Sequence, residues 1–231
     1  MKSDWRRETM RKYAKFITAG MTVAMFAMVS LTGCATEEEK EAAKQYQAEA
    51  ENYKKGNSYK KALEAMEKAL EQTPKDKELQ EAVEKTREES EKMQPYNETM
   101  EAAIKAIEAD DAKALDELQE SDAGRELAEL AKETGSYIYM PEGGTDGKGI
   151  GFYTFTDCDC DQWYYGDYSQ GKREGNGIWY YASSRTEDGS LYKEVYNGAW
   201  SGDAPNGEGH QLVVLGDKVD TDQNFQVKNG L

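Results

Sequence analysis

Aspartates and cysteines alternate in the segment Asp157-Cys158-Asp159-Cys160-Asp161. Alternate carboxylates could bind Ca²⁺, but a helix–loop–helix calcium site needs glycine sixth and glutamate twelfth. Those places hold Gln162 and Tyr168. Cysteines two apart in a strand lie about 7 Å apart, too far for an unstrained disulfide, although a turn brings them closer. We therefore expect a hairpin turn with solvated carboxylates, and metal binding or a redox pair are the alternatives.

A catalytic constellation is not recognisable in this chain. His210 is the only histidine, and it follows Gly209 in a predicted strand. No cysteine or serine has a recognisable base partner, and no motif selects one pair among the many carboxylates. We expect no enzyme, no cofactor and no bound metal. A hydrolase that uses acidic residues is the weakest alternative.

Cys34 ends the stretch Leu31-Thr32-Gly33-Cys34, which follows a basic start and an uncharged run from Phe16 to Ser30. The apolar stretch from Phe16 to Leu31 is short for a membrane span, which needs about 20 residues. These features are typical of a secretory signal rather than of a spanning helix.

The pattern around Cys34 resembles the lipobox of bacterial lipoprotein precursors. The resemblance implies a signal peptide over residues 1–33 and a diacylglycerol on the thiol of Cys34. Two or three acyl chains such as palmitate would then hold the chain stably on the extracytoplasmic face of a cell membrane. An uncleaved membrane anchor with a chance cysteine is the alternative.

The charge balance excludes one class of partner. The whole chain has a net charge of −16, and residues 1–33 carry six basic and two acidic residues. The remainder therefore has a net charge of −20. Such a chain repels nucleic acid and anionic lipid headgroups. It suits a soluble protein exposed in the envelope.

Two halves of the chain differ in composition. Residues 35–135 hold 28 acidic residues and four of the 24 aromatic residues, whereas residues 136–231 hold 16 aromatic residues and 16 of the 21 glycines. This shift predicts a domain boundary near Gly135 and an α+β protein, helical first and β afterwards. We expect a signal peptide (1–33), an acidic tether (34–42), an antiparallel helical domain (43–135) and a β-hairpin-repeat domain (136–231).

The segment from Ala43 to Pro74 has helical periodicity with a break at Gly56-Asn57, after which Ser58 can cap a second helix. Its spacing resembles one tetratricopeptide repeat of about 34 residues. One repeat has too little surface for a peptide groove. A spacer or packing module is therefore expected, with protein binding as the alternative. The resemblance rests on Ala50, Tyr53, Tyr59, Ala62, Met66, Ala69 and Pro74.

Further helices are expected up to Gly135. Thr73-Pro74 predicts the start of a third helix that runs to about Met93. Pro95-Tyr96-Asn97 predicts a break, with Asn97 as the cap of the next helix. Ser121 or Asp122 can cap a last helix, which Gly135 ends. The expected total is five or six short antiparallel helices.

Two segments in the second half share one spacing of aromatic residues and glycines. After Tyr164 and after Tyr196, glycine stands at +2, an aromatic residue at +4, and glycines at +11 and +13. Offsets 0, +2 and +4 lie on one face of a strand, and glycine beside an aromatic leaves room for its ring. The pattern resembles the MORN repeat, which implies one β-hairpin per copy in a single antiparallel sheet.

Weaker signals extend this sheet in both directions. Tyr137 and Tyr139 precede a glycine-rich turn and Gly149-Ile150-Gly151, as in a degenerate first copy. A strand is predicted for residues 211–215, and residues 225–231 look like the opening of another hairpin. The insert from Ser183 to Ser190 predicts a long surface turn.

The equivalent offsets predict that Tyr164, Tyr168, Tyr196 and Trp200 line one face of the sheet. That face is either buried against glycines and the preceding helices or open as an aromatic binding strip. We expect Tyr164 and Tyr196 to be structural, and Tyr168 and Trp200 to be partly available for binding.

Together these patterns indicate a non-enzymatic adaptor or scaffold, lipid-anchored at Cys34, that binds another protein of the cell envelope. The alternative is a glycan- or lipid-binding lipoprotein that uses the aromatic face of the sheet.

Overall fold

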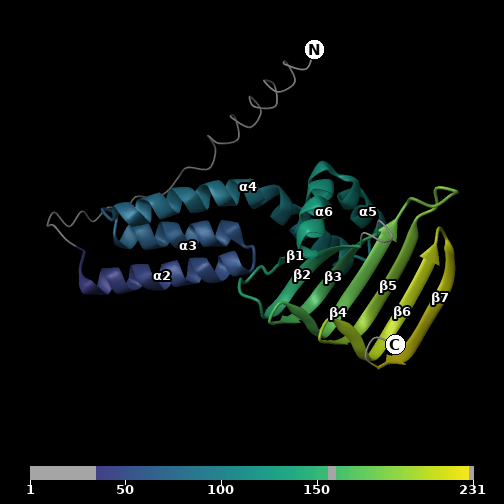
Figure 1. Ribbon diagram of the computed structural model, residues 1–231. Coiled ribbons are helices and arrows are strands. Elements are labelled where there is room, and N and C mark those ends of the chain that lie inside the picture. Colours follow the sequence, from purple (N-terminus) through teal and green to yellow (C-terminus); the bar gives the residue numbers. More distant parts are fainter. Residues whose placement is uncertain (1–34, 156–159, 229–231) are drawn as a thin grey trace, which may run out of the picture. The chain divides into compact units, whose positions relative to one another are not determined.

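The computed structural model describes residues 35–155 and 160–228 (Figure 1). Cys34, the predicted signal peptide and residues 156–159 lie outside the described residues. Within the described ranges, five helices precede a seven-stranded antiparallel sheet, which confirms the predicted α+β class and its order. In the same ranges, none of the helices combines the length and the hydrophobic character that a membrane span requires.

The first three helices are α2 (Glu37–Lys55), α3 (Tyr59–Gln72) and α4 (Lys77–Glu108). Helix α2 begins with a capping box, in which Thr36 Oγ1 accepts from the Glu39 amide and the Glu39 carboxylate accepts from the Thr36 amide. Fully buried alanines let these three helices approach one another closely. The core that the three helices share consists of Ala43, Ala50, Ala62, Ala65, Met66, Ala69, Leu79 and Val83. The tetratricopeptide-like character of this helix pair stays a prediction.

Helix α4 corrects the predicted break at Pro95. One helix runs from Lys77 to Glu108 with Pro95 inside it, and Asp76 rather than Thr73 caps its start. Pro95 and Glu91 are exposed, so water can satisfy the carbonyl that loses a partner at the proline. Asn97 is not a helix cap. Its side chain bonds to other elements of the fold instead.

The last helices are α5 (Ala112–Glu120) and α6 (Asp122–Thr134). Ser121 caps α6 by accepting from the Gly124 amide at 3.0 Å, as predicted. Gly135 ends α6 in the left-handed conformation with φ 84°, which also confirms the prediction.

The sheet is a simple meander in which each strand pairs with the next one along the chain, in the order β1 to β7 (Figure 1). Two hairpin turns, Gln170-Gly171 and Gly202-Asp203, have positive φ at both central residues, as type I′ turns require. The strands are β1 (Ser136–Tyr139), β2 (Gly147–Phe155), β3 (Cys160–Ser169), β4 (Lys172–Ser183), β5 (Tyr192–Ser201), β6 (Ala204–Leu215) and β7 (Lys218–Val227).

The register corrects two details of the expected repeats. Gly149 faces Gly166, so the glycines that match the first copy are Gly147 and Gly149, two residues earlier than the expected Gly149 and Gly151. Tyr137 and Tyr139 point to the helix side, and Ile138 takes the place expected for a tyrosine of the repeat. At the other end, β7 starts at Lys218 and extends the sheet by pairing with β6, well before the predicted start at Phe225.

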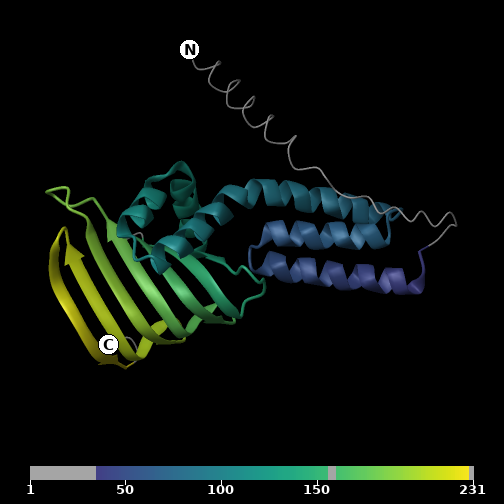
Figure 2. The same ribbon diagram turned by 180° about the vertical axis from the view of Figure 1, so that it is seen from behind.

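The two faces of the sheet have different cores. On one face, α6 packs on β1 and β2 and α5 packs on β4, while β6 and β7 lie beyond the helices in both views (Figures 1 and 2). Phe152, Trp163 and Tyr180 on this helix face join α4, α5 and α6 in one hydrophobic cluster. The other face, called here the outer face, has a separate cluster of aromatic rings. The shared cluster on the helix face argues against two independent domains divided at Gly135.

A buried polar network also joins the helices to the sheet. Asn97 donates to the Asn57 carbonyl at 2.9 Å and accepts from the Tyr137 hydroxyl at 2.9 Å. Asn57 in turn donates to the Ile138 carbonyl at 2.7 Å, and the Met140 amide donates to the Gly56 carbonyl at 2.8 Å. Burial raises the pKa of the Tyr137 hydroxyl well above its usual range. The turn between α2 and α3 is therefore fixed to the start of the sheet.

Candidate binding face of the sheet

The outer face repeats one packing unit twice. The ring of Tyr164 lies over Gly166 and Gly177, and the ring of Tyr196 lies over Gly198 and Gly209. A methyl group at any of these glycines would overlap the ring or the facing backbone. Each hydroxyl donates at 3.0 Å to the carbonyl three residues later, which belongs to Asp167 for Tyr164 and to Ala199 for Tyr196. The glycines are therefore required by close approach of the rings.

Arg173 lies among these rings. Its guanidinium carbon is 4.7 Å from the ring centres of both Tyr153 and Trp200, distances typical of cation–π contacts. The charge is balanced by Asp203, whose Oδ1 lies 3.5 Å from Arg173 Nε and whose carbonyl accepts from Nη2 at 2.7 Å. Arg173 therefore packs among the rings of this face with its positive charge balanced by the Asp203 carboxylate.

All four aromatic residues singled out in the sequence lie in this cluster, as the repeat predicts. Tyr164 is 0% exposed, Tyr168 3%, Tyr196 6% and Trp200 4%. The rings are buried by one another and by glycines, and the helices cover the opposite face. An open strip made of these four rings is therefore not present, and Tyr168 and Trp200 are less available than expected.

Accessible rings lie next to the buried ones. A pocket of about 360 Å³ opens on the outer face, with parts of Trp200 and Tyr196 in its wall together with half-buried Trp179 and Phe225. Polar groups in the same wall come from Arg173, Asp203 and Gln211. An apolar concavity with a few convergent polar groups is the usual form of a small-molecule site.

A second pocket, of about 410 Å³, lies further along the same strands and shares Trp179 with the first. Tyr181 and Tyr192 stand in its wall with ring centres 5.7 Å apart. Burial and a hydrogen bond to Glu194 raise the pKa of Tyr192 to about 12, so this hydroxyl stays a neutral donor in ordinary conditions.

Sequence reasoning missed Trp179, Tyr181 and Tyr192. Trp179 and Tyr181 follow Gly177 at steps of two, so they share the face of the repeat glycines. Tyr192 lies four residues before Tyr196 in β5, so it shares that face too, and it pairs with Ser183 across a long turn. The period of two could therefore have indicated all three residues, whereas the way they face one another across β4 and β5 required the register.

His210 and the aspartate–cysteine segment were the other candidate sites in the sequence. His210 pairs with Asp222 at 2.8 Å across β6 and β7, and it borders a polar hollow of about 600 Å³ on the helix-face side. Cys160 is disulfide-bonded, while Asp157, Cys158 and Asp159 lie outside the described residues. The described ranges contain no group of three or more His, Cys, Asp or Glu side chains arranged to hold a metal ion.

Comparisons with known proteins found no matching family model, no matching curated protein and no matching solved structure. The lipoprotein, tetratricopeptide and MORN resemblances therefore stay predictions.

Proposed function

We propose that this protein is a lipid-anchored adaptor of the bacterial cell envelope, which holds another protein at the free edge of its sheet. The anchor is the diacylglycerol expected on Cys34, a residue outside the described ranges. The observation that supports the proposal is strand β7, which among the described residues pairs with β6 and with no further strand.

The two halves of β7 differ in charge and in the regularity of their pairing with β6. Lys218, Asp220 and Asp222 put charges on the first half, and a register shift at Val213/Val214 interrupts its pairing with β6. Charges and bulges are the usual protection of an edge against pairing. The second half, Gln223–Val227, has no charge and no proline. This half can accept an extended segment of a partner by strand addition.

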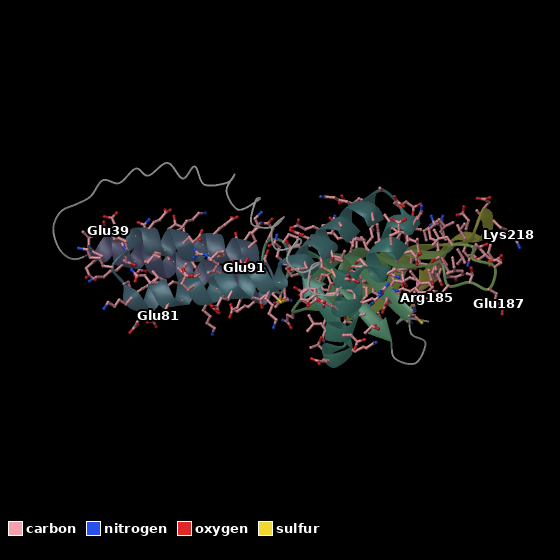
Figure 3. All side chains as sticks on the ribbon, turned by 90° about the horizontal axis from the view of Figure 1, so that it is seen from above. Glu39, Glu81, Glu91, Arg185, Glu187 and Lys218 are labelled. Carbon is pink, nitrogen blue, oxygen red and sulfur yellow. The ribbon has the colours of Figure 1, made fainter. Side chains whose placement is uncertain are left out.

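The helical part supports a spacer role. Helix α2 starts at Glu37, three residues after Cys34, so a lipid there would lie next to the helices. Carboxylates such as those of Glu39 and Glu81 point outward from α2 and α4 (Figure 3). Their negative charge repels anionic headgroups, and the buried network at Asn97 fixes the helices to the sheet. The spacer would thus keep β7 available.

Affinity purification from detergent-solubilised envelopes tests the adaptor role. The variant Asn224→Lys with Gln226→Lys adds charge to the exposed second half of β7 and should abolish co-purification of the partner. The variant Gln80→Lys with Gln94→Lys adds the same charge on exposed positions of α4 and should leave it unchanged. Equal recovery of the same partner from both variants would refute the edge as the binding site.

A second candidate is ligand binding by the outer face, which the two pockets around Trp179 favour. This role is separate from strand addition because the pockets need no free strand edge.

A further inference from the structure

We infer that the outer face of the sheet has a second binding site, an extended groove that takes an uncharged glycan chain. The groove consists of the two pockets that share Trp179, with volumes of about 360 and 410 Å³. It goes beyond the adaptor role because its ligand would contact side chains of the outer face, whereas strand addition uses backbone groups at the edge of β7. The side chains of Phe225 and Val227 on β7 also stand in its wall.

The strand register shows that the two pockets follow the same strands on the same face. Trp179 pairs with Tyr196, Tyr181 with Glu194 and Ser183 with Tyr192, in steps of two along β4 and β5. Side chains at such steps point to one side of a sheet. The groove therefore runs lengthwise over β4 and β5, with Trp200 towards one end and Tyr192 towards the other.

Ring surfaces recur along the groove. Trp179 is half-buried and stands between the pockets, while Tyr181 and Tyr192 are half-buried at the far end. A sugar ring has an apolar face of C–H groups and a rim of hydroxyls, so it packs on an aromatic ring and still needs polar partners. A row of partly exposed rings offers that surface to successive sugars.

Polar side chains with fixed orientation stand beside these rings. Gln162 accepts from the Trp179 indole at 2.8 Å, and Gln211 donates to Glu194 at 2.9 Å. An amide group has two donors and an acceptor with two lone pairs, so neither bond uses its full capacity. These groups are held in place before any ligand arrives, which lowers the entropy cost of binding.

The charges in the groove select an uncharged ligand. The walls hold the cations Arg173 and Arg185 and the anions Asp203 and Glu194, so they carry no net charge. Arg173 is already paired with Asp203, and Arg185 bonds to the Glu120 carboxylate. Because the whole chain has a net charge of −16, an acidic polysaccharide would be repelled.

The backbone beneath the groove argues for a glycan over a peptide. Strands β4 and β5 each pair on both sides, so their N–H and C=O groups serve the sheet ladder. An extended peptide laid here would leave its own backbone groups without a strand partner. A glycan has no such requirement, since its hydroxyls bond to side chains. An acyl chain would leave the remaining donors and acceptors of the Gln162 and Gln211 amides without partners.

Titration calorimetry on the full chain in detergent micelles tests this site. The probes are a neutral tetrasaccharide of N-acetylglucosamine, a neutral tetrasaccharide of glucose, an oligogalacturonate, an uncharged extended peptide and phosphatidylcholine dissolved in the same micelles. We expect at least one neutral tetrasaccharide to bind once per chain and to change the tryptophan fluorescence. Binding of only the acidic glycan, the peptide or the phosphatidylcholine would overturn the proposal, as would binding of none of the probes.

Variants locate the site. Trp179→Ala should weaken binding of the neutral tetrasaccharide about tenfold or more, as loss of a central aromatic contact does. Tyr165→Ala is the matched control, because Tyr165 is a half-buried ring on the helix face. If Trp179→Ala unfolds the chain, Tyr181→Ala replaces it. Equal affinity in the groove variant and in Tyr165→Ala would refute the groove.

The same variants separate this proposal from the adaptor role. Trp179→Ala should leave co-purification of the protein partner unchanged, and the two lysines on β7 should leave glycan affinity unchanged. Loss of both activities in both variants would contradict two independent sites.

Discussion

Trp200 packs edge-on against Tyr164 and Tyr196, with ring centres 4.9 and 5.5 Å away. Its indole N–H donates to the Gly177 carbonyl at 3.3 Å, and Arg173 lies against its ring. Trp200→Ala would open a large cavity in this cluster. We expect a loss of about 3–5 kcal/mol in the free energy of unfolding, measured by urea denaturation.

Trp200→Phe keeps most of the buried surface and loses the indole hydrogen bond and part of the ring packing, so its cost should be smaller than that of Trp200→Ala. If Trp200→Ala retains nearly full stability, the outer-face cluster is not a core. The aromatic strip would then be open to partners after all.

Because several tyrosines are buried, we expect the protein to become less stable in alkaline solution. Burial raises the pKa of Tyr137, Tyr164, Tyr168 and Tyr180 above the usual value of about 10. Below that pH these groups are neutral in both states and their contribution is fully present. As pH rises above about 10, the unfolded state loses protons first, so stability falls with increasing pH.

The measurement is tyrosinate absorbance together with circular dichroism during an alkaline titration. We expect the last tyrosines to ionise only in step with loss of the β signal. Ionisation of every tyrosine at about pH 10 with the β signal intact would contradict the burial of these hydroxyls.

The proposed lipid anchor would depend on one thiol, that of Cys34. Cys34→Ala removes the atom that would carry the diacylglycerol, so the variant should remain an uncleaved precursor or be misplaced. It should incorporate no labelled fatty acid, whereas Cys160→Ala should label as the wild type does. Equal labelling of wild type and Cys34→Ala would refute the lipoprotein proposal.

At the scale of elements, the core shared by the helices and the sheet determines which fragments of the chain can fold on their own. Phe152 and Trp163 on the sheet are fully buried in a cluster with Leu115 and Leu127 of α5 and α6. A fragment of residues 136–231 would expose this face to water. We expect it to aggregate or to lack cooperative unfolding, while residues 35–231 unfold in a single transition.

Circular dichroism and thermal melts of both fragments check this expectation. The fragment of residues 35–92 keeps the α2–α3 core and its partner residues on α4, so it is the control that should stay helical. A cooperative β-type transition in the 136–231 fragment would restore the division at Gly135.

Local signals in the sequence predicted much of this architecture. Gly135 ends the last helix because only glycine takes φ 84° easily, and the tyrosine–glycine spacing predicts hairpins because rings and glycines must alternate on one face. The predicted break at Pro95 was wrong because the contacts of Asn97 with Asn57 and Tyr137 stabilise the helix beyond the proline. Such contacts join residues 40 positions apart, and a local pattern does not contain them.

The candidate site was predictable only in part. The four repeat aromatics share a face as expected, but their own packing hides them. The accessible groove depends on which residues of β4 and β5 face each other, for example Ser183 and Tyr192 across the long turn. Pairing across a turn of that length is set by the whole sheet.

At the scale of the whole molecule, we propose three roles for three parts of the chain. A lipid on Cys34 would hold the chain on the membrane, the helices would serve as a spacer, and the sheet would present the edge of β7 and the outer groove. The two surfaces of the sheet are distinct because β7 uses backbone groups, whereas the groove uses side chains over β4 and β5.

The most direct test of the adaptor role is a photo-crosslinking scan in intact envelopes, with the crosslinker placed singly along β7 and along α2. Strand addition predicts one discrete protein adduct from positions 223–226, and none from exposed positions of α2 such as Glu38. With the crosslinker at position 223 or 225, the adduct should disappear when Asn224 and Gln226 are replaced by lysine on the same strand. The same adduct from both elements, or none from β7, would contradict the account.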